Sequence, residues 1–487
     1  MGFPTSIIPL FFGKVKRFCK FSGIRTAKHA DTVSNDMERR VDVAFSSLIF
    51  LFAFLPLLLA VYCLCPRGRR QGVLIAAGLL FCAYDRPASL LPLALTAGAA
   101  FLFARLYERS GRRLCFWCGV AVVLLPLLCF KYVPCFREAG LPQGISFYTF
   151  SHLAYLADVR CGRIRAERSL PAYACFSTLL PLLGAGPILR YGETGEQLRA
   201  RRETVAAFGA GVGRFCCGLG KKLILGDALA GAYRYLRALL AYQPTAGGAW
   251  LTVLCFTLHL YFDFSGYTDM AIGVGRMFGF RFPENFDYPF LARSITDFWR
   301  RWHLSLSRWF RDYVYIPLGG NRKGRLRQCV NLAAVWLLTG VWHGTGVNFL
   351  LWGAYFCVIL ICEHLFLHRV LERLPGWIAH LYTLVLVLVS FLIFSYSDPG
   401  AGWTCFLALF GVGTVGGTAA VLSWQVLRML PLLALAVIGS TPLPRRLWGA
   451  VCCRVPAALP VGSLALLVLC VAYLLDSSFL PFAYLNF

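Results

Sequence analysis

Long apolar stretches alternate with short polar ones through most of the chain. A helix needs about 20 apolar residues to cross a bilayer, and stretches near this length recur from residue 45 onward. The shorter ones are expected to be tilted, re-entrant or buried among other helices. The pattern predicts an all-α polytopic membrane protein with about eleven membrane segments. These are expected at 45–65, 89–107, 114–132, 172–189, 247–263, 329–342, 345–366, 380–397, 402–422, 428–440 and 461–475.

Residues 1–44 depart from this pattern. They carry eight Lys or Arg and four Asp or Glu, and their one apolar patch covers only 7–12. The run at 45–65 is too long for the core of a signal peptide and has no small-x-small cleavage site beside it, so we expect it to remain in the mature chain. The sequence therefore predicts a basic N-terminal extension, 1–44, followed by one membrane domain, 45–487.

The composition indicates a multi-pass protein of the cytoplasmic membrane. Hydrophobic residues make up 58% of the chain and charged residues 15%, whereas soluble domains have about 45–50% apolar and about 25% charged residues. These values exclude a cytosolic enzyme, a disordered chain and a secreted disulfide scaffold. The formal net charge of +25 comes largely from short basic clusters between apolar runs, such as 67–70, 322–327 and 445–454. That is the positive-inside pattern, so we expect membrane lipid as a partner and no nucleic acid.

Three ionisable residues, His259, Asp263 and Asp269, lie within or beside the apolar run at 247–263. Ionisable groups at membrane depth are costly and usually face a cavity or a partner. One interpretation is therefore a polar pathway for donor or substrate. The alternative is that the two acids neutralise basic residues further along the chain. The candidates for that pairing are Arg276, Arg281 and Arg293.

A cationic amphipathic helix is predicted next. Ser294-Ile-Thr-Asp297 is a capping-box pattern that predicts a helix start, and the helix is expected to reach Ile316, before Pro317. Large apolar side chains recur along it with arginines between them, which is typical of helices in the membrane interface. The helix either anchors the surface or walls the entrance for an anionic ligand such as a coenzyme, and His303 lies beside its apolar stripe. The stripe comprises Phe298, Trp302, Leu306, Trp309 and Tyr313, with Arg300, Arg301, Arg308 and Arg311 between them.

His343 lies in the next apolar region, within Trp342-His343-Gly344. A single histidine in a span is often merely packed or hydrogen-bonded. Here Gly340, Gly344 and Gly346 leave room for a substrate or another backbone. Burial also keeps an imidazole neutral and able to accept a proton, which a general base for a hydroxyl nucleophile must do.

Two other motifs support no cofactor site. The basic glycine loop at 319–324, which contains Asn321, lacks the Walker spacing and is therefore no P-loop. It is either a cytoplasmic connector or a turn with affinity for phosphate. His364 and His368 are four residues apart beside Glu363, but no third ligand can be identified, so no metal is predicted.

Several long motifs resemble the membrane-bound O-acyltransferases and, within them, the branch that O-acetylates alginate. The motif Ile316-Pro-Leu-Gly-Gly-Asn-Arg322 favours this branch over teichoic-acid D-alanylation, and the resemblance extends over about 45–487. Members usually begin near the pattern that starts here at Phe45, so we hypothesise that 1–44 come from a mis-called start codon. An intact native peptide from 1–40 would refute this. The motifs are 183–190, 261–273, 283–289, 294–322, 342–344 and 481–487.

The resemblance implies a fold and a set of site residues. The family fold is a ring-like bundle of tilted helices around a thin central region, with interfacial amphipathic helices. By resemblance, His343 corresponds to the family's active-site histidine and His303 to the second family histidine. We expect His343 to act as general base and His303 to orient the donor or stabilise developing charge. The candidates for a donor or substrate channel are Asp263, Asp269, Arg300, Arg301, Trp302, Arg311, Asn321 and Trp342.

The resemblance also implies O-acyl transfer through the membrane. An acyl group, acetyl in the main hypothesis, would pass from a cytoplasmic thioester such as acetyl-CoA to hydroxyls of an extracytoplasmic polysaccharide, as in the biosynthesis of alginate and other exopolysaccharides. It would pass directly or through a relay partner, an SGNH or esterase-like acyltransferase, and no bound cofactor is expected. Two alternatives stay open. One is D-alanyl transfer to teichoic acid from a small acidic carrier; the other is a non-catalytic transporter of glycan or lipid, with the histidines only lining a pore.

Overall fold

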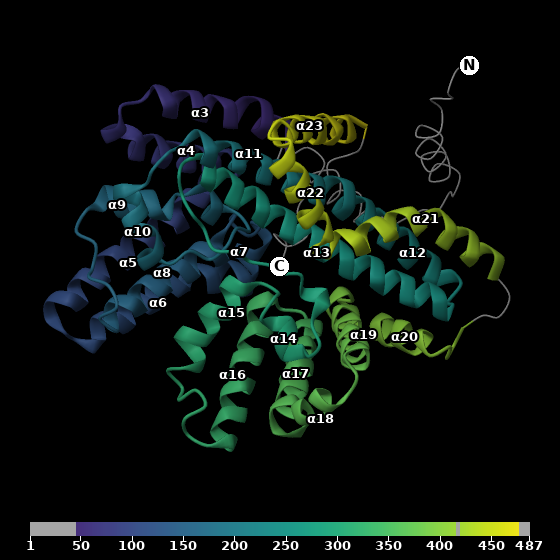
Figure 1. Cartoon of the computed structure of the whole chain (residues 1–487). Helices are drawn as coiled ribbons and strands as arrows, with labels where there is room; N and C mark the ends of the chain where they lie inside the picture. The colour runs from purple at the N-terminus through teal and green to yellow at the C-terminus, as the bar shows by residue number, and fades with distance from the viewer. Residues whose placement is uncertain (1–44, 415–418, 477–487) are drawn as a thin grey trace, which may run out of the picture. The chain divides into compact units, whose positions relative to one another are not determined.

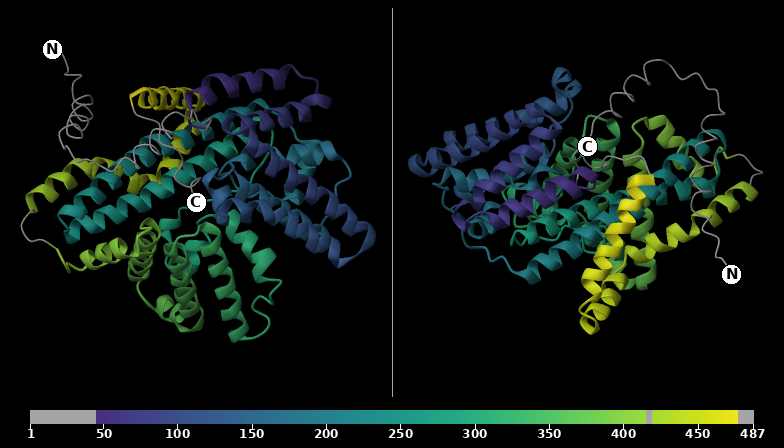
Figure 2. Two further views of the ribbon diagram at one scale, coloured as in Figure 1. Left: turned by 180° about the vertical axis from the view of Figure 1, so that it is seen from behind. Right: turned by 90° about the horizontal axis from the view of Figure 1, so that it is seen from above.

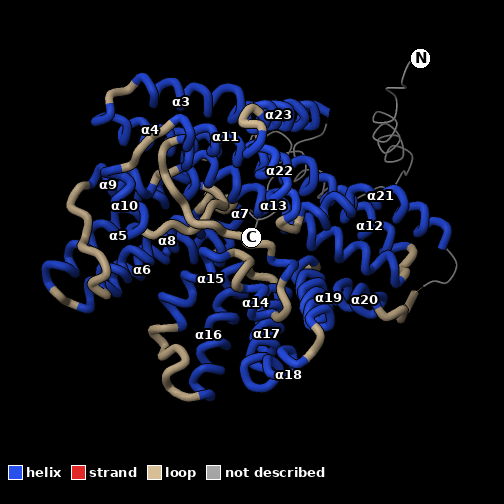
Figure 3. The backbone as a smooth tube through the Cα atoms, viewed as in Figure 1, coloured by secondary structure: helices blue, strands red, loops and turns tan. Residues whose placement is uncertain are grey.

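The computed structural model describes residues 45–414 and 419–476 (Figures 1 and 2). Within them, helices are the only regular secondary structure, and loops join them as Figure 3 shows. The predicted all-α class is therefore confirmed. The basic segment 1–44 and the motif 481–487 lie outside the described residues, as does part of the expected segment 402–422.

The N-terminal helices, purple to blue in Figure 1, are α3 (Leu55–Leu64), α4 (Arg70–Asp85), α5 (Leu90–Ser110), α6 (Arg113–Tyr132), α7 (Pro134–Glu138), α8 (Ile145–Arg160), α9 (Leu170–Ser177) and α10 (Tyr191–Ala200). A π-helical turn at Phe50–Phe54 leads into α3. α5 ends because Gly111 adopts a left-handed conformation with φ 65°, which glycine reaches without strain. α6 begins two residues later and returns alongside α5, and both contact α8.

The segment 172–189 does not form the predicted membrane span. α9 ends at Ser177, a 3-10 turn follows at Leu180–Leu183, and the chain then leaves helical conformation, because prolines and glycines interrupt it. The stretch is buried, and a Cβ at Gly184 would lie only 1.5 Å from the hydroxyl oxygen of Tyr267. Non-helical backbone at membrane depth is tolerated where protein surrounds it, and protein surrounds this stretch.

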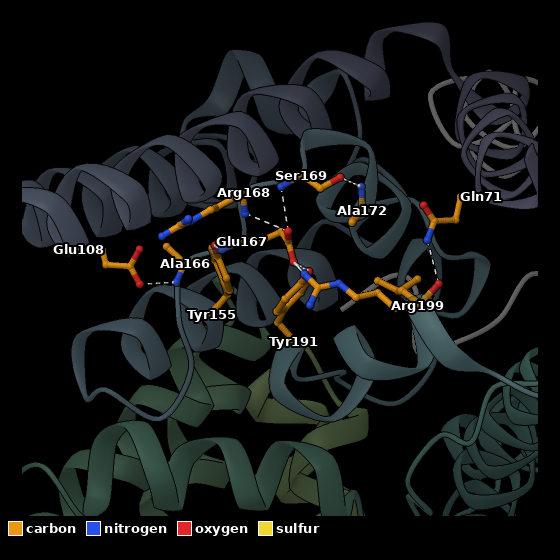
Figure 4. Close-up of polar contacts among 11 residues, drawn as sticks. Gln71, Glu108, Tyr155, Ala166, Glu167, Arg168, Ser169, Ala172, Tyr191 and Arg199 are labelled. Atoms are coloured by element: carbon orange, nitrogen blue, oxygen red, sulfur yellow. Dashed lines mark hydrogen bonds and ion pairs between the residues drawn. The ribbon is translucent and has the colours of Figure 1, made fainter. Parts of the chain in front are cut away.

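A buried carboxylate fixes the loop between α8 and α9 (Figure 4). Glu167 accepts hydrogen bonds from the backbone N–H groups of Arg168 (2.9 Å) and Ser169 (2.8 Å). The Tyr191 hydroxyl donates to the same carboxylate, and Arg199 forms an ion pair with it. Burial alone raises the pKa of Glu167, but these donors and the charge of Arg199 outweigh it and hold the pKa below its usual value. The carboxylate therefore ties the loop to α10.

The central helices, teal in Figure 1, are α11 (Val205–Gly220), α12 (Ala228–Tyr242) and α13 (Ala246–Met277). A π-helical turn at Lys221–Asp227 joins α11 to α12. Glycines occupy the face where α11 meets α13. A Cβ at Gly218 would lie 2.5 Å from the carbonyl oxygen of Gly266, and a Cβ at Gly211 would lie 2.8 Å from that of Gly273. These small residues let the two backbones approach closely.

The later helices, green to yellow in Figure 1, are α14 (Ile295–Trp299), α15 (Leu304–Phe310), α16 (Arg325–His343), α17 (Val347–Cys362), α18 (His368–Arg373), α19 (Gly376–Ser395), α20 (Pro399–Leu409), α21 (Ala419–Gly439), α22 (Leu443–Arg454) and α23 (Ala458–Asp476). Figures 1 and 2 show α16 to α19 on one side of α13 and α3, α11 and α23 on the other. α13 also contacts α12, α19 and α20. It is therefore the element against which both halves of the described region pack.

Five helical segments in the described part of the chain are long and apolar enough to cross a membrane, or six if the bent pair Val426–Gly439 and Leu443–Arg454, 70° apart, is one span. The prediction of a multi-pass membrane protein is confirmed, but the count of about eleven segments is not. α13, for example, is 32 residues long but carries several charges. The qualifying segments are Pro87–Ser110, Arg113–Tyr132, Val347–Arg373, Gly376–Ser395 and Ala458–Asp476.

Candidate active site

The chain between α14 and α15 is a turn, so the prediction of one continuous amphipathic helix over 294–316 is wrong. Its predicted start is confirmed, because the Ser294 hydroxyl accepts a hydrogen bond from the Asp297 backbone N–H at 3.0 Å. The helix then stops at Trp299, and His303 adopts φ 47° and ψ 54°. This left-handed conformation is costly for a residue other than glycine, and such strain concentrates at functional sites.

Backbone hydrogen bonds from a neighbouring segment stabilise this turn. The Leu304 N–H donates to the Asn285 carbonyl at 2.9 Å, and the Asp287 N–H donates to the Arg301 carbonyl at 2.9 Å. Each buried backbone group needs a partner, and here partners outside the helix replace those that a continuous helix would supply. The segment 285–287 therefore places His303 at the bend.

Asn285 also determines which nitrogen of His303 carries the proton. Its side-chain Oδ1 accepts from the Ser305 backbone N–H (3.1 Å) and the Ser305 hydroxyl (2.9 Å), and lies 3.1 Å from His303 Nδ1. Because a backbone N–H can only donate, the Asn285 atom is the acceptor oxygen, so His303 Nδ1 donates to it. In a neutral imidazole the other nitrogen, Nε2, is then a hydrogen-bond acceptor.

His343 is the last residue of α16, and aromatic rings surround it. The imidazole centroid lies 4.6 Å from the Trp342 ring, 4.9 Å from the Trp352 ring and 5.2 Å from the Phe394 ring. His343 is 5% exposed and His303 is 1% exposed. Both imidazoles are thus shielded from solvent by large apolar side chains, which strengthens any electrostatic interaction made there.

The two histidines share one small cavity of about 20 Å³. A cavity needs roughly 10–15 Å³ to hold one water, so this one accommodates a water-sized or methyl-sized group. Its walls come from α13 to α17 and α19 together with the His303 turn, and the described wall residues include no carboxylate. The wall residues are Leu260, Trp299, Trp302, His303, Leu306, Thr339, His343, Trp352, Phe391 and Phe394.

The structure brings only some of the expected site residues to this cavity. Trp302 lines it, and the Trp342 ring lies beside both histidines, with its centroid 6.5 Å from that of His303. The others lie on exposed or half-buried positions along 300–321, and their role at a donor entrance stays a prediction. They are Arg300, Arg301, Arg311 and Asn321.

The two acids of α13 lie in ion pairs away from the cavity. Asp263 is 2.7 Å from Lys222 Nζ. Asp269 is 2.7 Å from both Lys221 Nζ and the Arg214 guanidinium. These bases come from α11 and the π-helical turn after it, which pack along α13, and a polar pathway through the acids stays a prediction. Both acids are therefore neutralised by basic residues, but the prediction of their partners is wrong, since it named Arg276, Arg281 and Arg293.

Glu363 binds the start of α14. Its carboxylate accepts from the Ile295 N–H (2.7 Å), the Thr296 N–H (2.8 Å) and the Thr296 hydroxyl (2.7 Å). It thereby satisfies donors that a helix N-terminus leaves unpaired.

Over 45–414 and 419–476, no group of three or more His, Cys, Asp or Glu could hold a metal ion.

Two residues at the site were not predicted from the sequence. Asn285 lies in the motif 283–289, but nothing in that motif indicates that its amide faces a histidine 18 positions later. Lys131 lies near the end of the apolar run 114–132 and contacts Trp342. A lysine in such a run is itself a signal of a buried functional or structural partner.

Comparison with known proteins identifies the family of this chain. The model of MBOAT, the membrane-bound O-acyltransferase family, matches residues 147–423, which include both histidines of the cavity. The chain belongs to this family. It is 39% identical over 402 residues to the "Probable alginate O-acetylase AlgI" of Pseudomonas aeruginosa, with 76% of each chain covered.

More distant relatives carry related activities. The chain is 34% identical over 288 residues to the "Peptidoglycan O-acetyltransferase" of Helicobacter pylori, with 52% of this chain and 54% of the relative covered. It is 29% identical over 271 residues to the "Teichoic acid D-alanyltransferase" of Bacillus subtilis, with 51% and 68% covered. The chain is therefore a multi-pass membrane O-acyltransferase, and its resemblance to the O-acetylating branch is confirmed.

Proposed function

We propose that this acyltransferase transfers an acetyl group from cytoplasmic acetyl-CoA to hydroxyl groups of an extracytoplasmic polysaccharide. His343 acts as the general base on the acceptor hydroxyl. The observation that carries the proposal is the cavity of about 20 Å³ onto which both imidazoles open. Two titratable side chains from separate motifs, enclosed with space for one small group, suit proton transfer at a reacting carbonyl.

The proposed reaction is a single acyl exchange. His343 takes the proton of the acceptor hydroxyl while the hydroxyl oxygen attacks the thioester carbonyl. The carbon–sulfur bond breaks, the ester forms, and the thiol of coenzyme A leaves with the proton that the imidazole had taken. Positioned proton transfer of this kind contributes about 10²–10⁴-fold, and holding donor and acceptor together contributes more.

The hydrogen bond to Asn285 narrows the role of His303. With Nδ1 donating to Asn285 Oδ1 at 3.1 Å, a neutral His303 presents an accepting Nε2. It can therefore accept a hydrogen bond from a hydroxyl or thiol, whereas donation to a developing oxyanion requires the imidazolium. Of the two expected roles, orienting a reactant suits this tautomer better than stabilising charge.

The cavity favours acetyl over D-alanyl as the transferred group. A D-alanyl group carries an ammonium, which needs an acidic or strongly polar partner when it is buried. The described wall is aromatic and aliphatic apart from the two histidines and Thr339, and it includes no carboxylate. The 39% identity to an O-acetylase, against 29% to a D-alanyltransferase, points the same way.

The donor is expected to approach along the arginine-bearing segment that follows α14. Arg300, Arg308 and Arg311 are exposed there, and guanidinium groups bind phosphates of the kind that coenzyme A carries. Because the cavity takes only a methyl-sized group, side chains must move to admit the pantetheine arm.

The acceptor receives the acetyl group directly or through an extracytoplasmic SGNH-type partner.

The test is the O-acetyl content of cell-envelope glycans, measured by NMR in cells with native chain, with H343A, or without the chain. Native chain should support acetylation, and H343A should reduce it to the level of cells without the chain while inserting normally. H364A is the matched control, because His364 is exposed and away from the cavity. Native-level acetylation in H343A would overturn the proposal.

A further inference from the structure

Lys131 is a buried cation near the end of an apolar helix. It lies in α6, which is long and apolar enough to span a membrane, and the residue is 7% exposed. A charged side chain inside the bilayer costs several kcal/mol unless it has a partner, and it marks a functional site by default. An apolar side chain would occupy this position at a lower free-energy cost, so the lysine is expected to have a specific partner.

The partner of Lys131 is the end of the helix that carries His343. Its ammonium donates a hydrogen bond to the Trp342 carbonyl and lies 5.3 Å from the centroid of the Trp342 ring. Next to it, the Tyr132 hydroxyl donates to the Val341 carbonyl. Two successive side chains of α6 therefore bind the two carbonyls that immediately precede His343.

The same stretch makes a third contact beyond His343. The Arg137 guanidinium lies 3.3 Å from the hydroxyl oxygen of Thr345. Residues 131–137 thus contact the chain at 341, 342 and 345, on both sides of the imidazole. His343 lies at the centre of the bound stretch.

Helix physics explains why cationic and hydroxyl donors gather there. The last four carbonyls of a helix have no intrahelical donor, and the C-terminal end of a helix attracts positive charge. α16 ends at His343. Lys131 and Tyr132 supply donors that these terminal carbonyls lack.

We propose that Lys131 is a positioning residue for acyl transfer, which holds the Trp342 carbonyl and so places the His343 imidazole against the cavity. The inference rests on the proposed role of His343 as base. Lys131 acts through His343 rather than on the reacting atoms. A displacement of about 1 Å at a reacting group costs on the order of 10²-fold in rate, so a loosened helix end is enough to slow the reaction.

The decisive variant is K131M, measured in purified protein in nanodiscs with acetyl-CoA and a soluble oligosaccharide acceptor. Methionine keeps the length of the side chain but removes the charge and the donor. The kcat should fall about 10²-fold, with the KM for acetyl-CoA changed by less than about twofold, because an interaction that affects only the transition state appears in kcat. The thermal unfolding midpoint should change little, because removal of a costly buried charge offsets the loss of the donor to the Trp342 carbonyl.

Conservative and neighbouring variants separate positioning from a merely structural role. K131R keeps the charge and the donor, and should recover at least a tenth of the native kcat. Y132F removes the neighbouring donor and should lower kcat by about two- to fivefold. L128M is the control for disturbance of α6, because Leu128 is 47% exposed, and it should match native chain in both constants.

Each outcome decides the matter. A native kcat in K131M, or a fall in kcat accompanied by an equal loss of thermal stability that K131R does not rescue, overturns the inference. H343Q, run in parallel, tests the proposed function separately. If H343Q retains native activity, the base assignment fails; if H343Q is inactive while K131M is native-like, only the positioning role of Lys131 fails.

Discussion

Replacing Asn285 should disable the site through His303. The Asn285 Oδ1 accepts three buried donors: His303 Nδ1 and the backbone N–H and hydroxyl of Ser305. N285L keeps a side chain of similar size but offers no acceptor. A buried donor left without a partner costs about 1–3 kcal/mol, so three of them cost at least about 3 kcal/mol if no water enters.

The catalytic effect should be larger than the loss of stability alone explains. Without Asn285, nothing requires Nδ1 to donate, and the strained His303 backbone at φ 47° loses a contact that holds it. We expect N285L to lower acetyl transfer by about 10²-fold or more, the order of positioned acid–base catalysis. Its thermal unfolding midpoint in detergent should also fall.

N285D is the companion variant that keeps the reasoning testable if N285L does not fold. Aspartate retains an oxygen in the same place and can accept all three hydrogen bonds, so N285D should fold and keep more than about a tenth of native transfer. The assays are acetyl transfer from radiolabelled acetyl-CoA and the thermal midpoint by fluorescence-detected gel filtration. Native activity and a native midpoint in N285L would refute the reasoning.

Two further predictions concern the fold around the site. G218A should destabilise the chain by about 1–3 kcal/mol through overpacking, since its Cβ would meet the Gly266 carbonyl at 2.5 Å, whereas G209A, with nothing within 4 Å, should be neutral or stabilising; equal thermal midpoints in the two variants would contradict this packing. E167Q should lower stability at pH 7 by about 1–3 kcal/mol. Because the folded-state pKa of Glu167 is depressed, its contribution exists above about pH 4.5 and is lost as the pH falls through the folded pKa. The unfolding midpoints of native chain and E167Q should therefore stay apart from pH 7 down to about pH 4.5 and converge only as the pH falls further, and a gap that stays constant through the acid range would contradict the assignment.

Local chemistry could be predicted from the sequence where a feature depends on neighbouring residues. The capping box at Ser294 is formed as predicted, because its hydrogen bond spans three residues. The predicted helix is longer than the one that forms, because the break at His303 depends on hydrogen bonds to backbone groups of 285–287. No periodicity within 294–316 encodes those bonds.

Ion-pair partners were missed for the same reason. Asp263 pairs with Lys222 across 41 positions, because α11, the π-helical turn after it and α13 pack side by side.

The two candidate histidines illustrate the opposite case. Motif resemblance identified both, 40 residues apart, and the structure shows them on one cavity. What the sequence could not supply was Asn285 and Lys131, whose roles depend on contacts between distant segments.

The most direct test of the account is single-turnover acetyl transfer in proteoliposomes that contain the purified chain, with acetyl-CoA on one side of the membrane and a hydroxyl acceptor on the other. We expect native chain and H364A to form acetylated acceptor and release coenzyme A thiol in equal amounts, and H343A to form neither at a measurable rate. Product formation by H343A at the rate of H364A would contradict the claim that this imidazole, in its shared cavity with His303, performs the chemistry.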